Sequence, residues 1–206
     1  LKRSINKWKS DGDILFIIAS LKFAPYLSDM CTNSLYAEKC KIYSDLMINL
    51  FKNIPTSKEY KIKIRLFPED GQDKQILNNI ENLCRKKNLN LSNEKTIAEA
   101  YGKSSLCIFT YEGTPFSESM ARNVPSLLLL FEELNPIREK YKNIFDVLKK
   151  SNIVHTSEES LIKHMLNIRD NINLWWSSLK VIKARKLYCN EFAPNSSRIT
   201  SEIQEI

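Results

Sequence analysis

Short apolar runs alternate with longer amphipathic stretches along the chain. The runs are rich in Ile, Leu, Phe and Val, which is typical of strands that are buried on both faces of a parallel sheet. The central strands are predicted at 13–19, 61–67, 106–111 and 126–131. Two shorter runs predict further strands at Leu89–Leu91 and Ile153–His155.

The stretches between these runs carry apolar residues at helical spacing. The predicted helices cover Ser34–Ile54 and Gln72–Lys87, then begin at the capping box Thr96–Glu99, at Asn135–Pro136 and at the capping box Thr156–Glu159. A last helix is predicted from about Ser178 to Phe192, packing through Trp175, Trp176, Leu187 and Phe192.

This alternation, without internal repeats, predicts an α/β fold. We expect a three-layer, Rossmann-like, doubly wound parallel sheet followed by a C-terminal helical extension. The expected division of the chain is a linker at 1–12, the Rossmann-like domain at 13–170 and the extension at 171–206.

The stretch from Leu106 to Phe131 predicts a strand, a loop, a helix and a second strand in succession. Thr114 is predicted as the helix N-cap, and Pro115 as the first helical residue, where its missing N–H costs nothing. A loop that joins a buried strand to a helix N-terminus suits an anion. The hydroxyls of Thr114 and Ser117 suit a phosphate, and the carboxylate of Glu118 suits a ribose diol.

Ligands of doubly wound sheets bind beyond the carboxyl ends of the strands. The segments predicted at this edge are 20–29, 65–71, 90–93, 110–118, 132–135 and His155. Arg65 can fork onto a phosphate if it points over the edge, and His155 and Asn93 are further candidates. Each of the main candidates has a structural alternative: Arg65 as a solvated strand charge, His155 as a packing residue, and Glu118 as a surface residue favoured by the helix dipole.

Composition adds a charge and excludes several classes of protein. The 206 residues carry a net charge of +7, which favours an anionic partner such as a nucleotide phosphate or an anionic membrane surface. Aromatic residues are not interleaved with the scattered basic ones, so we expect no nucleic-acid partner. Only 4 glycines are present, in neither a Walker loop nor a GxGxxG motif, and the 5 cysteines include no CxxC pair.

These patterns predict a reduced, cytoplasmic protein without a metal site or a cofactor. Since no apolar run approaches 18 residues, no membrane span is expected. The sequence begins at Leu1 rather than Met, and we expect it to be part of a longer protein.

Three segments carry a family resemblance. ESMARNVP at 118–125 resembles the segment of GT-B glycosyltransferases in which a Glu holds the donor ribose. RLFPED at 65–70 and LWWSSLKVIKARKLYCNEFA at 174–193 are similar to segments of a family of bacterial surface-carbohydrate transferases that are encoded with O-antigen and lipopolysaccharide genes. The resemblance covers roughly 60–193.

The resemblance implies one half of a GT-B fold, with a nucleotide sugar as the donor substrate. It places Arg65, Thr114, Ser117 and Glu118 against that donor, and it identifies no catalytic residue. Many retaining GT-B enzymes carry a second Glu eight positions before the ribose Glu, where this chain has Thr110. The acceptor site and catalytic base of GT-B enzymes come from an N-terminal half, so we expect this half to be inactive alone.

Other readings of the same fold stay open at this point. They are a sugar-nucleotide epimerase, a polyol-phosphate transferase that uses CDP-linked donors, and a non-enzymatic, flavodoxin-like binding module. The sequence also leaves open the nucleotide, the sugar, the acceptor, the stereochemical outcome and the oligomeric state. For location, it leaves a choice between the cytoplasm and peripheral attachment to the inner membrane.

Overall fold

Parallel strands in the order β3-β2-β1-β4-β5-β6 form the centre of the molecule. The computed structural model describes residues 9, 11–19, 33–55, 61–66, 74–87 and 89–193. Its strands are β1 (Asp13–Ile17), β2 (Ile62–Arg65), β3 (Asn90–Leu91), β4 (Ser104–Phe109), β5 (Ser126–Leu129) and β6 (Val154–His155). The predicted α/β class and the parallel, doubly wound sheet are therefore confirmed.

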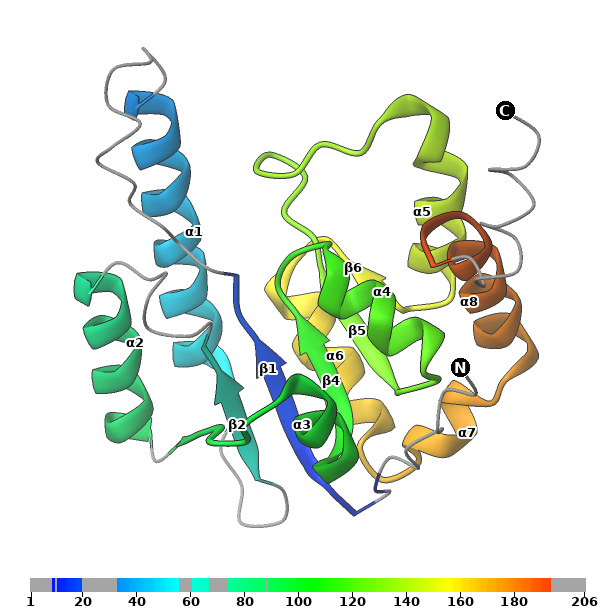
Figure 1. Cartoon of the computed structure of the whole chain (residues 1–206), viewed down its shortest axis with the longest axis horizontal. Helices are drawn as coiled ribbons and strands as arrows, with labels where there is room; N and C mark the ends of the chain where they lie inside the picture. The colour runs from blue at the N-terminus through cyan, green and yellow to red at the C-terminus, as the bar shows by residue number, and fades with distance from the viewer. Residues whose placement is uncertain are drawn as a thin grey trace.

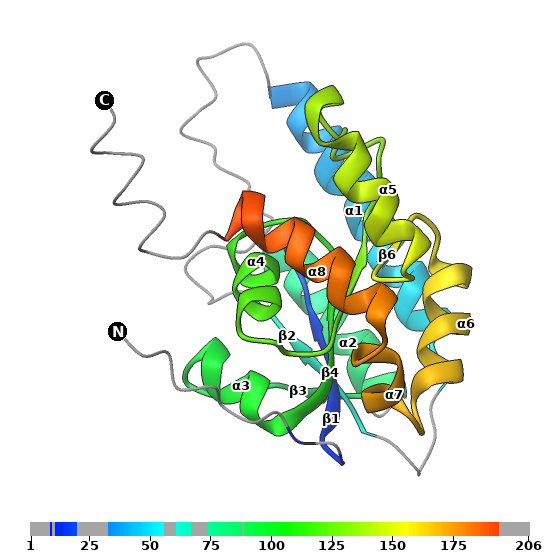
Figure 2. The same ribbon diagram turned by 90° about the vertical axis from the view of Figure 1, so that its right-hand side faces the viewer.

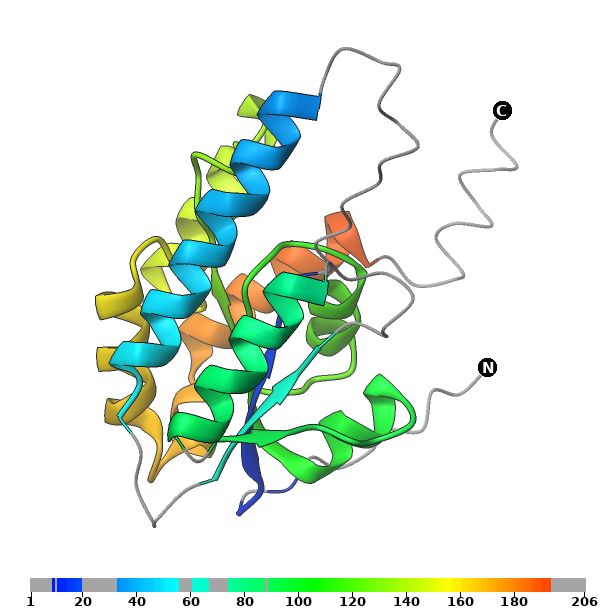
Figure 3. The same ribbon diagram turned by 90° about the vertical axis from the view of Figure 1, so that its left-hand side faces the viewer.

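Helices follow the strands and cover the sheet on both faces. They are α1 (Asn33–Asn53), α2 (Lys74–Lys87), α3 (Ile97–Lys103), α4 (Thr114–Ala121), α5 (Lys142–Lys150), α6 (Glu158–Ile168), α7 (Ile172–Trp176) and α8 (Leu179–Phe192). Helices α1 and α2 lie side by side, as Figures 1 and 3 show. Helices α3, α4 and α8 belong to the other outer layer, where they face the viewer in Figure 2.

Two hydrophobic clusters, one on each face, hold the layers together. One, the α1 cluster, joins the sheet to α1, α2 and α6. The other, the α8 cluster, joins it to α3, α4, α5 and α8. Successive residues of the central strands point into opposite clusters, so that Leu128 and Leu129 are both fully buried, as the apolar pattern of this strand predicts.

Several helix starts differ from the predicted ones. The helix predicted at Asn135–Pro136 begins only at Lys142, after a 3-10 turn over Glu139–Tyr141. Ser157, not Thr156, caps α6 by accepting a hydrogen bond from the Ser160 N–H. Such shifts arise because neighbouring hydroxyl and amide residues can each serve as a cap, and the packing of the helix selects one of them.

The last helix packs on the domain as predicted, except at one of the four predicted residues. Trp176 is buried, and Trp175 and Phe192 are half-buried against the α8 cluster, as expected. The prediction for Leu187 is wrong, because this side chain is 38% exposed. The buried residues of α8 are Val181, Ala184 and Tyr188. Within the described part of the chain, no helix is long and apolar enough to cross a membrane.

Candidate functional site

The connection from β4 to α4 lies at the point where the strand order reverses. β1 is flanked by β2 and β4, so that chain segments leave the sheet in opposite directions on its two sides. Gly113 is the N-cap of α4, and the predicted cap, Thr114, is the first helical residue instead. The described residues provide no side-chain cap for this helix end. No side chain of the described residues therefore competes with an anion for the N–H groups of the first turn.

Glu118 lies one turn into α4 and is partly exposed. Its Oε1 is 2.7 Å from Nη2 of Arg122, and the two side chains are 31% and 29% exposed. Tyr101 of α3 lies near this pair: burial raises the pKa of Tyr101, and the charge of Glu118 adds to that shift. The Tyr101 hydroxyl also donates to the Pro115 carbonyl at 2.8 Å. Glu118 is therefore on the side of α4 that is toward α3.

Ser117 lies on the other side of the same helix, against α8. Its Oγ is 2.8 Å from the Tyr188 hydroxyl, and Tyr188 donates to Oε1 of Glu112 at 2.8 Å. Since a tyrosine hydroxyl carries one proton, Ser117 is the donor in the first contact. The structure thus places Ser117 and Glu118 on different sides of α4. Through Tyr188 it connects Ser117 to the carboxylate of Glu112, which the sequence analysis did not single out.

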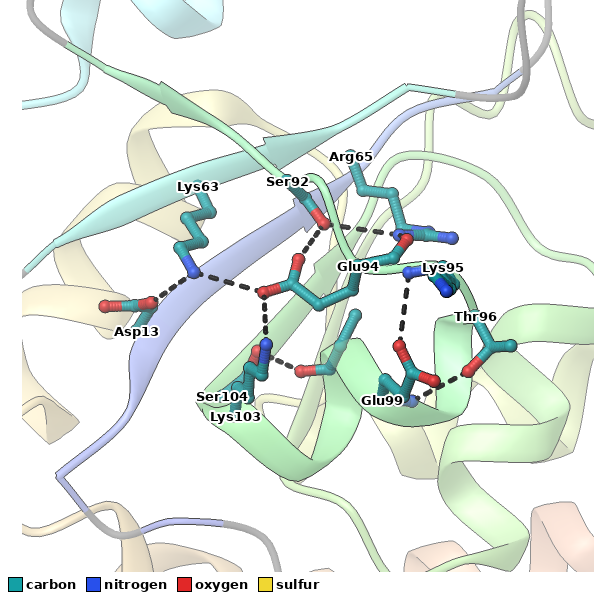
Figure 4. A network of polar contacts seen from close by, with 11 residues as sticks. Asp13, Lys63, Arg65, Ser92, Glu94, Lys95, Thr96, Glu99, Lys103 and Ser104 are labelled. Atoms are coloured by element: carbon teal, nitrogen blue, oxygen red, sulfur yellow. Dashed lines mark hydrogen bonds and ion pairs between the residues drawn. The ribbon is translucent and has the colours of Figure 1, made fainter.

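Arg65 ends β2 and contacts the segment after β3. Its Nη1 donates to the Glu94 carbonyl at 3.0 Å and to the Ser92 hydroxyl at 3.3 Å, as Figure 4 shows. Asn93 lies between these two partners in sequence and is exposed. Arg65 and Asn93 are thereby placed together at one corner of the sheet.

Strand register relates this corner to α4. Ile17 of β1 is paired with Arg65 on one side and with Phe109 on the other. Two strand spacings therefore separate Arg65 from the end of β4, which is about 10 Å between Cα atoms. Because Ile64 points into the α1 cluster, Arg65 points to the opposite face, on which α3 and α4 lie.

Below this corner a buried carboxylate, that of Glu94, contacts two lysine ammonium groups and one serine hydroxyl. Glu94 is 8% exposed, and its Oε1 lies 3.2 Å from Nζ of Lys63 and 3.4 Å from Nζ of Lys103. Lys63 also contacts Asp13 at 2.9 Å. Burial raises the pKa of Glu94, but hydrogen bonds from Ser92 and Lys63 outweigh it and bring this pKa to about 2. Figure 4 shows the network, which anchors the segment that carries Asn93.

His155 lies on the opposite face of the sheet from Glu118. It pairs in register with Leu129, a residue of the α1 cluster, and its ring lies 5.3 Å from that of His164 in α6. Nδ1 contacts the Ser160 hydroxyl at 2.8 Å and Nε2 contacts the Asn152 carbonyl at 3.1 Å. Nε2 must then carry the proton, because a carbonyl only accepts. Burial, aided by His164, lowers the pKa of His155 to about 4.

Thr110 occupies the position at which many retaining GT-B enzymes carry a second Glu. It is fully buried, and its hydroxyl contacts the hydroxyl of Tyr43 and donates to the Ile17 carbonyl at 3.2 Å. Tyr43 in turn accepts from the N–H of Ala19 at 2.9 Å. These bonds fix the carboxyl ends of β1 and β4 together, which is a structural role for this position.

Of the segments predicted at this edge, 20–29 lies outside the described residues, and of 65–71 only Arg65 and Leu66 are described. Among the described residues, no group of three or more His, Cys, Asp or Glu side chains is arranged to hold a metal ion.

The residues that sequence reasoning missed are Glu112, Tyr188 and Glu94. A signal existed for Glu112, which directly precedes the N-cap glycine in the segment predicted at the edge. No local signal identifies Tyr188, since its partners are 71 and 76 positions away. Glu94 was hidden for the same reason, because its cationic partner Lys63 is 31 positions away.

Comparison with protein families matches residues 1–206 to the LIC12162 family transferases. No curated protein and no solved structure matches the chain.

Proposed function

The chain belongs to the LIC12162 family transferases, and from this we propose that it is the donor-binding domain of a glycosyltransferase that acts in bacterial surface-polysaccharide biosynthesis. The donor is a nucleotide sugar. On this proposal Glu118 holds the ribose, the N-terminus of α4 with Thr114 receives the phosphates, and Arg65 borders the nucleoside side.

The observation that carries the proposal is the start of α4. The helix follows β4 at the reversal of strand order, its N-terminus has no side-chain cap among the described residues, and a partly exposed carboxylate lies one turn in. Ligands of doubly wound sheets bind at such reversals, and helix N-termini favour phosphate. A carboxylate accepts hydrogen bonds from both hydroxyls of a ribose.

The mechanism that follows is displacement of the nucleotide from the sugar. Charge develops on the leaving phosphate, and the N–H groups of α4 are oriented before the reaction to stabilise it. Arg65, about 10 Å away across β1, is within the span of a nucleoside diphosphate. The acceptor site and the catalytic base are assigned to the other half of a GT-B enzyme.

The test compares two substitutions of the same kind. Glu118→Gln removes the carboxylate proposed for the ribose, whereas Glu81→Gln removes one from α2, where Glu81 pairs with Arg85 at the same i,i+4 spacing and 3.5 Å. Both changes should alter the free energy of unfolding by no more than about 0.5 kcal/mol, since i,i+4 pairs on partly exposed helix surfaces contribute little.

Calorimetric titration with UDP, GDP, CDP, CMP and dTDP then measures nucleotide affinity. We expect Glu118→Gln to weaken the tightest nucleotide about tenfold or more, because a charge-assisted hydrogen bond contributes about 1.5–3 kcal/mol. Glu81→Gln should bind like the wild type. Equal affinity in all three proteins would remove Glu118 from the site, and the absence of any nucleotide binding would reject the function.

A further inference from the structure

A cavity of about 350 Å³ lies beside the proposed phosphate position, at the carboxyl ends of β4 and β5. Its lining includes the polar residues Glu112, Asn135 and Arg138 and the aromatic residues Tyr141, Phe145 and Phe192. Its volume is at the lower end of the roughly 300–1,000 Å³ typical of ligand pockets. It is therefore suited to a group no larger than a single sugar ring with its substituents.

Hydrogen bonds hold the Glu112 carboxylate of this cavity in place. Tyr188 is fully buried and donates to Oε1 of Glu112, and Ser117 donates to Tyr188 in turn. Edge contact with Phe116 at 5.2 Å and stacking on Phe192 at 4.7 Å fix the Tyr188 ring. The structure gives Oε2 of Glu112 no partner among the described residues, so that this oxygen remains for a ligand in the cavity.

The aromatic residues and the amide of the lining are complementary to a sugar. Tyr141 and Phe192 meet edge to face at 4.9 Å, and Phe145 lies 6.1 Å from Phe192, which gives the cavity an aromatic wall. Such a wall packs against the C–H groups of a sugar ring. The Glu112 carboxylate accepts hydrogen bonds from hydroxyls, and the Asn135 amide both donates and accepts them.

The position of the cavity relative to α4 gives the orientation of the donor. Glu112 directly precedes the N-cap Gly113, and the Ser117 side of α4 faces α8, whereas Glu118 is on the side toward α3. A diphosphate at the N-terminus of α4 would thus have its ribose toward Glu118 and its sugar toward Glu112.

We propose that this cavity holds the sugar of the nucleotide-sugar donor, with Glu112 accepting hydrogen bonds from the sugar hydroxyls and Tyr188 positioning Glu112. The proposal rests on the proposed function, since it assigns the other end of the same ligand. It makes Glu112 a residue that distinguishes the intact donor from the free nucleotide.

The experiment measures the affinity of the 206-residue chain for three matched pairs by calorimetry: UDP and UDP-glucose, GDP and GDP-mannose, and dTDP and dTDP-glucose. For the pair that binds the wild type, Glu112→Gln should weaken the sugar conjugate about tenfold and leave the diphosphate within about twofold. Tyr188→Phe keeps the buried ring, removes the hydroxyl and should weaken the conjugate selectively as well. Glu139→Gln, which changes a carboxylate paired with Lys142 outside the cavity lining, is the matched control.

Each result separates the two proposals. If Glu112→Gln changes conjugate and diphosphate equally, or changes neither, the sugar assignment is overturned while the nucleotide site stands. If Tyr188→Phe affects both ligands equally, Tyr188 is structural and its positioning role is overturned. If Glu118→Gln leaves diphosphate affinity unchanged, the proposed function fails separately, and if no pair binds the wild type, both proposals fall.

Discussion

At the scale of single residues, burial decides what the chain's ionisable groups can do. His155 was a candidate site residue, and the structure places its ring against that of His164 in α6, which in turn contacts the ring of Trp175. Nε2 of His164 is buried without a hydrogen-bond partner in the described part of the chain. A proton on either ring would be poorly solvated there, so both histidines have lowered pKa values.

This gives a pH dependence with a defined sign. An unfolded His155 binds a proton below about pH 6.5, whereas the folded one does so only near pH 4. Its contribution to stability is complete above pH 6.5 and is lost as the pH falls toward 4. Between pH 7 and pH 4.5 the wild type should therefore lose roughly 2 kcal/mol that a His155→Gln variant does not lose.

Urea unfolding of both proteins at several pH values in this range measures that difference. His164 titrates in both proteins, and Glu94, with its pKa near 2, stays ionised throughout. A variant whose unfolding free energy falls with the same slope as that of the wild type would contradict the assignment to His155.

At the scale of elements, the sequence predicted those parts whose signals are local. The strands β1, β4 and β5 appear where apolar runs were found, and Thr96 caps α3 by accepting from the Glu99 N–H as its capping box predicts. The reciprocal bond differs, because Glu99 accepts from the N–H of Lys95 rather than that of Thr96. Local chemistry sets the element, and tertiary packing moves its end by a residue or two.

What the sequence could not predict depends on which elements meet. Apolar residues surround much of α8, so that periodicity alone does not choose between Leu187 and Tyr188. The choice is made by α4 and α5, whose rings of Phe116 and Phe145 contact Tyr188. The candidate site shows the same limit: Glu118 could be selected from its helix, but the contacts of Ser117 depend on α8.

Neighbouring substitutions in α8 test this packing. Tyr188→Ala empties a fully buried site and should lower the free energy of unfolding by about 3–5 kcal/mol, as large-to-small changes of buried aromatic residues do. Leu187→Ala, one position away and 38% exposed, should cost less than about 1 kcal/mol. Urea unfolding measures both, and similar losses in the two variants would show that α8 packs through another face.

At the scale of the whole molecule, the two C-terminal helices close the domain. Nε1 of Trp176 donates to Oδ1 of Asn123 at 2.9 Å, and Nε1 of Trp175 donates to the Ser151 carbonyl at 3.3 Å. Asn123 has a φ of 62°, the left-handed conformation common where a helix ends. The turns after α4 and α5 are thereby fixed by residues of α7.

These contacts of α7 bear on the predicted boundary between a domain at 13–170 and an extension at 171–206. Removal of residues 171–206 would take away Trp176, Val181, Ala184 and Tyr188, all of them buried in the cluster that covers β4 and β5. Exposure of this cluster would lower the free energy of unfolding by several times the roughly 2–5 kcal/mol of a single large-to-small core change. The total free energy of unfolding of a domain is only about 5–15 kcal/mol. We therefore expect a chain of residues 1–170 to lose its cooperative thermal transition and to bind a dye specific for exposed apolar surface.

A chain of residues 1–193 is the matched control, because it keeps α7 and α8 and removes only residues outside the described part. It should melt like the full chain when the two are followed by circular dichroism under the same conditions. If instead residues 1–170 melt cooperatively within a few degrees of the full chain, the C-terminal helices are an independent extension. The Tyr188 contact with Glu112 would then be an attachment to a finished domain rather than part of its core.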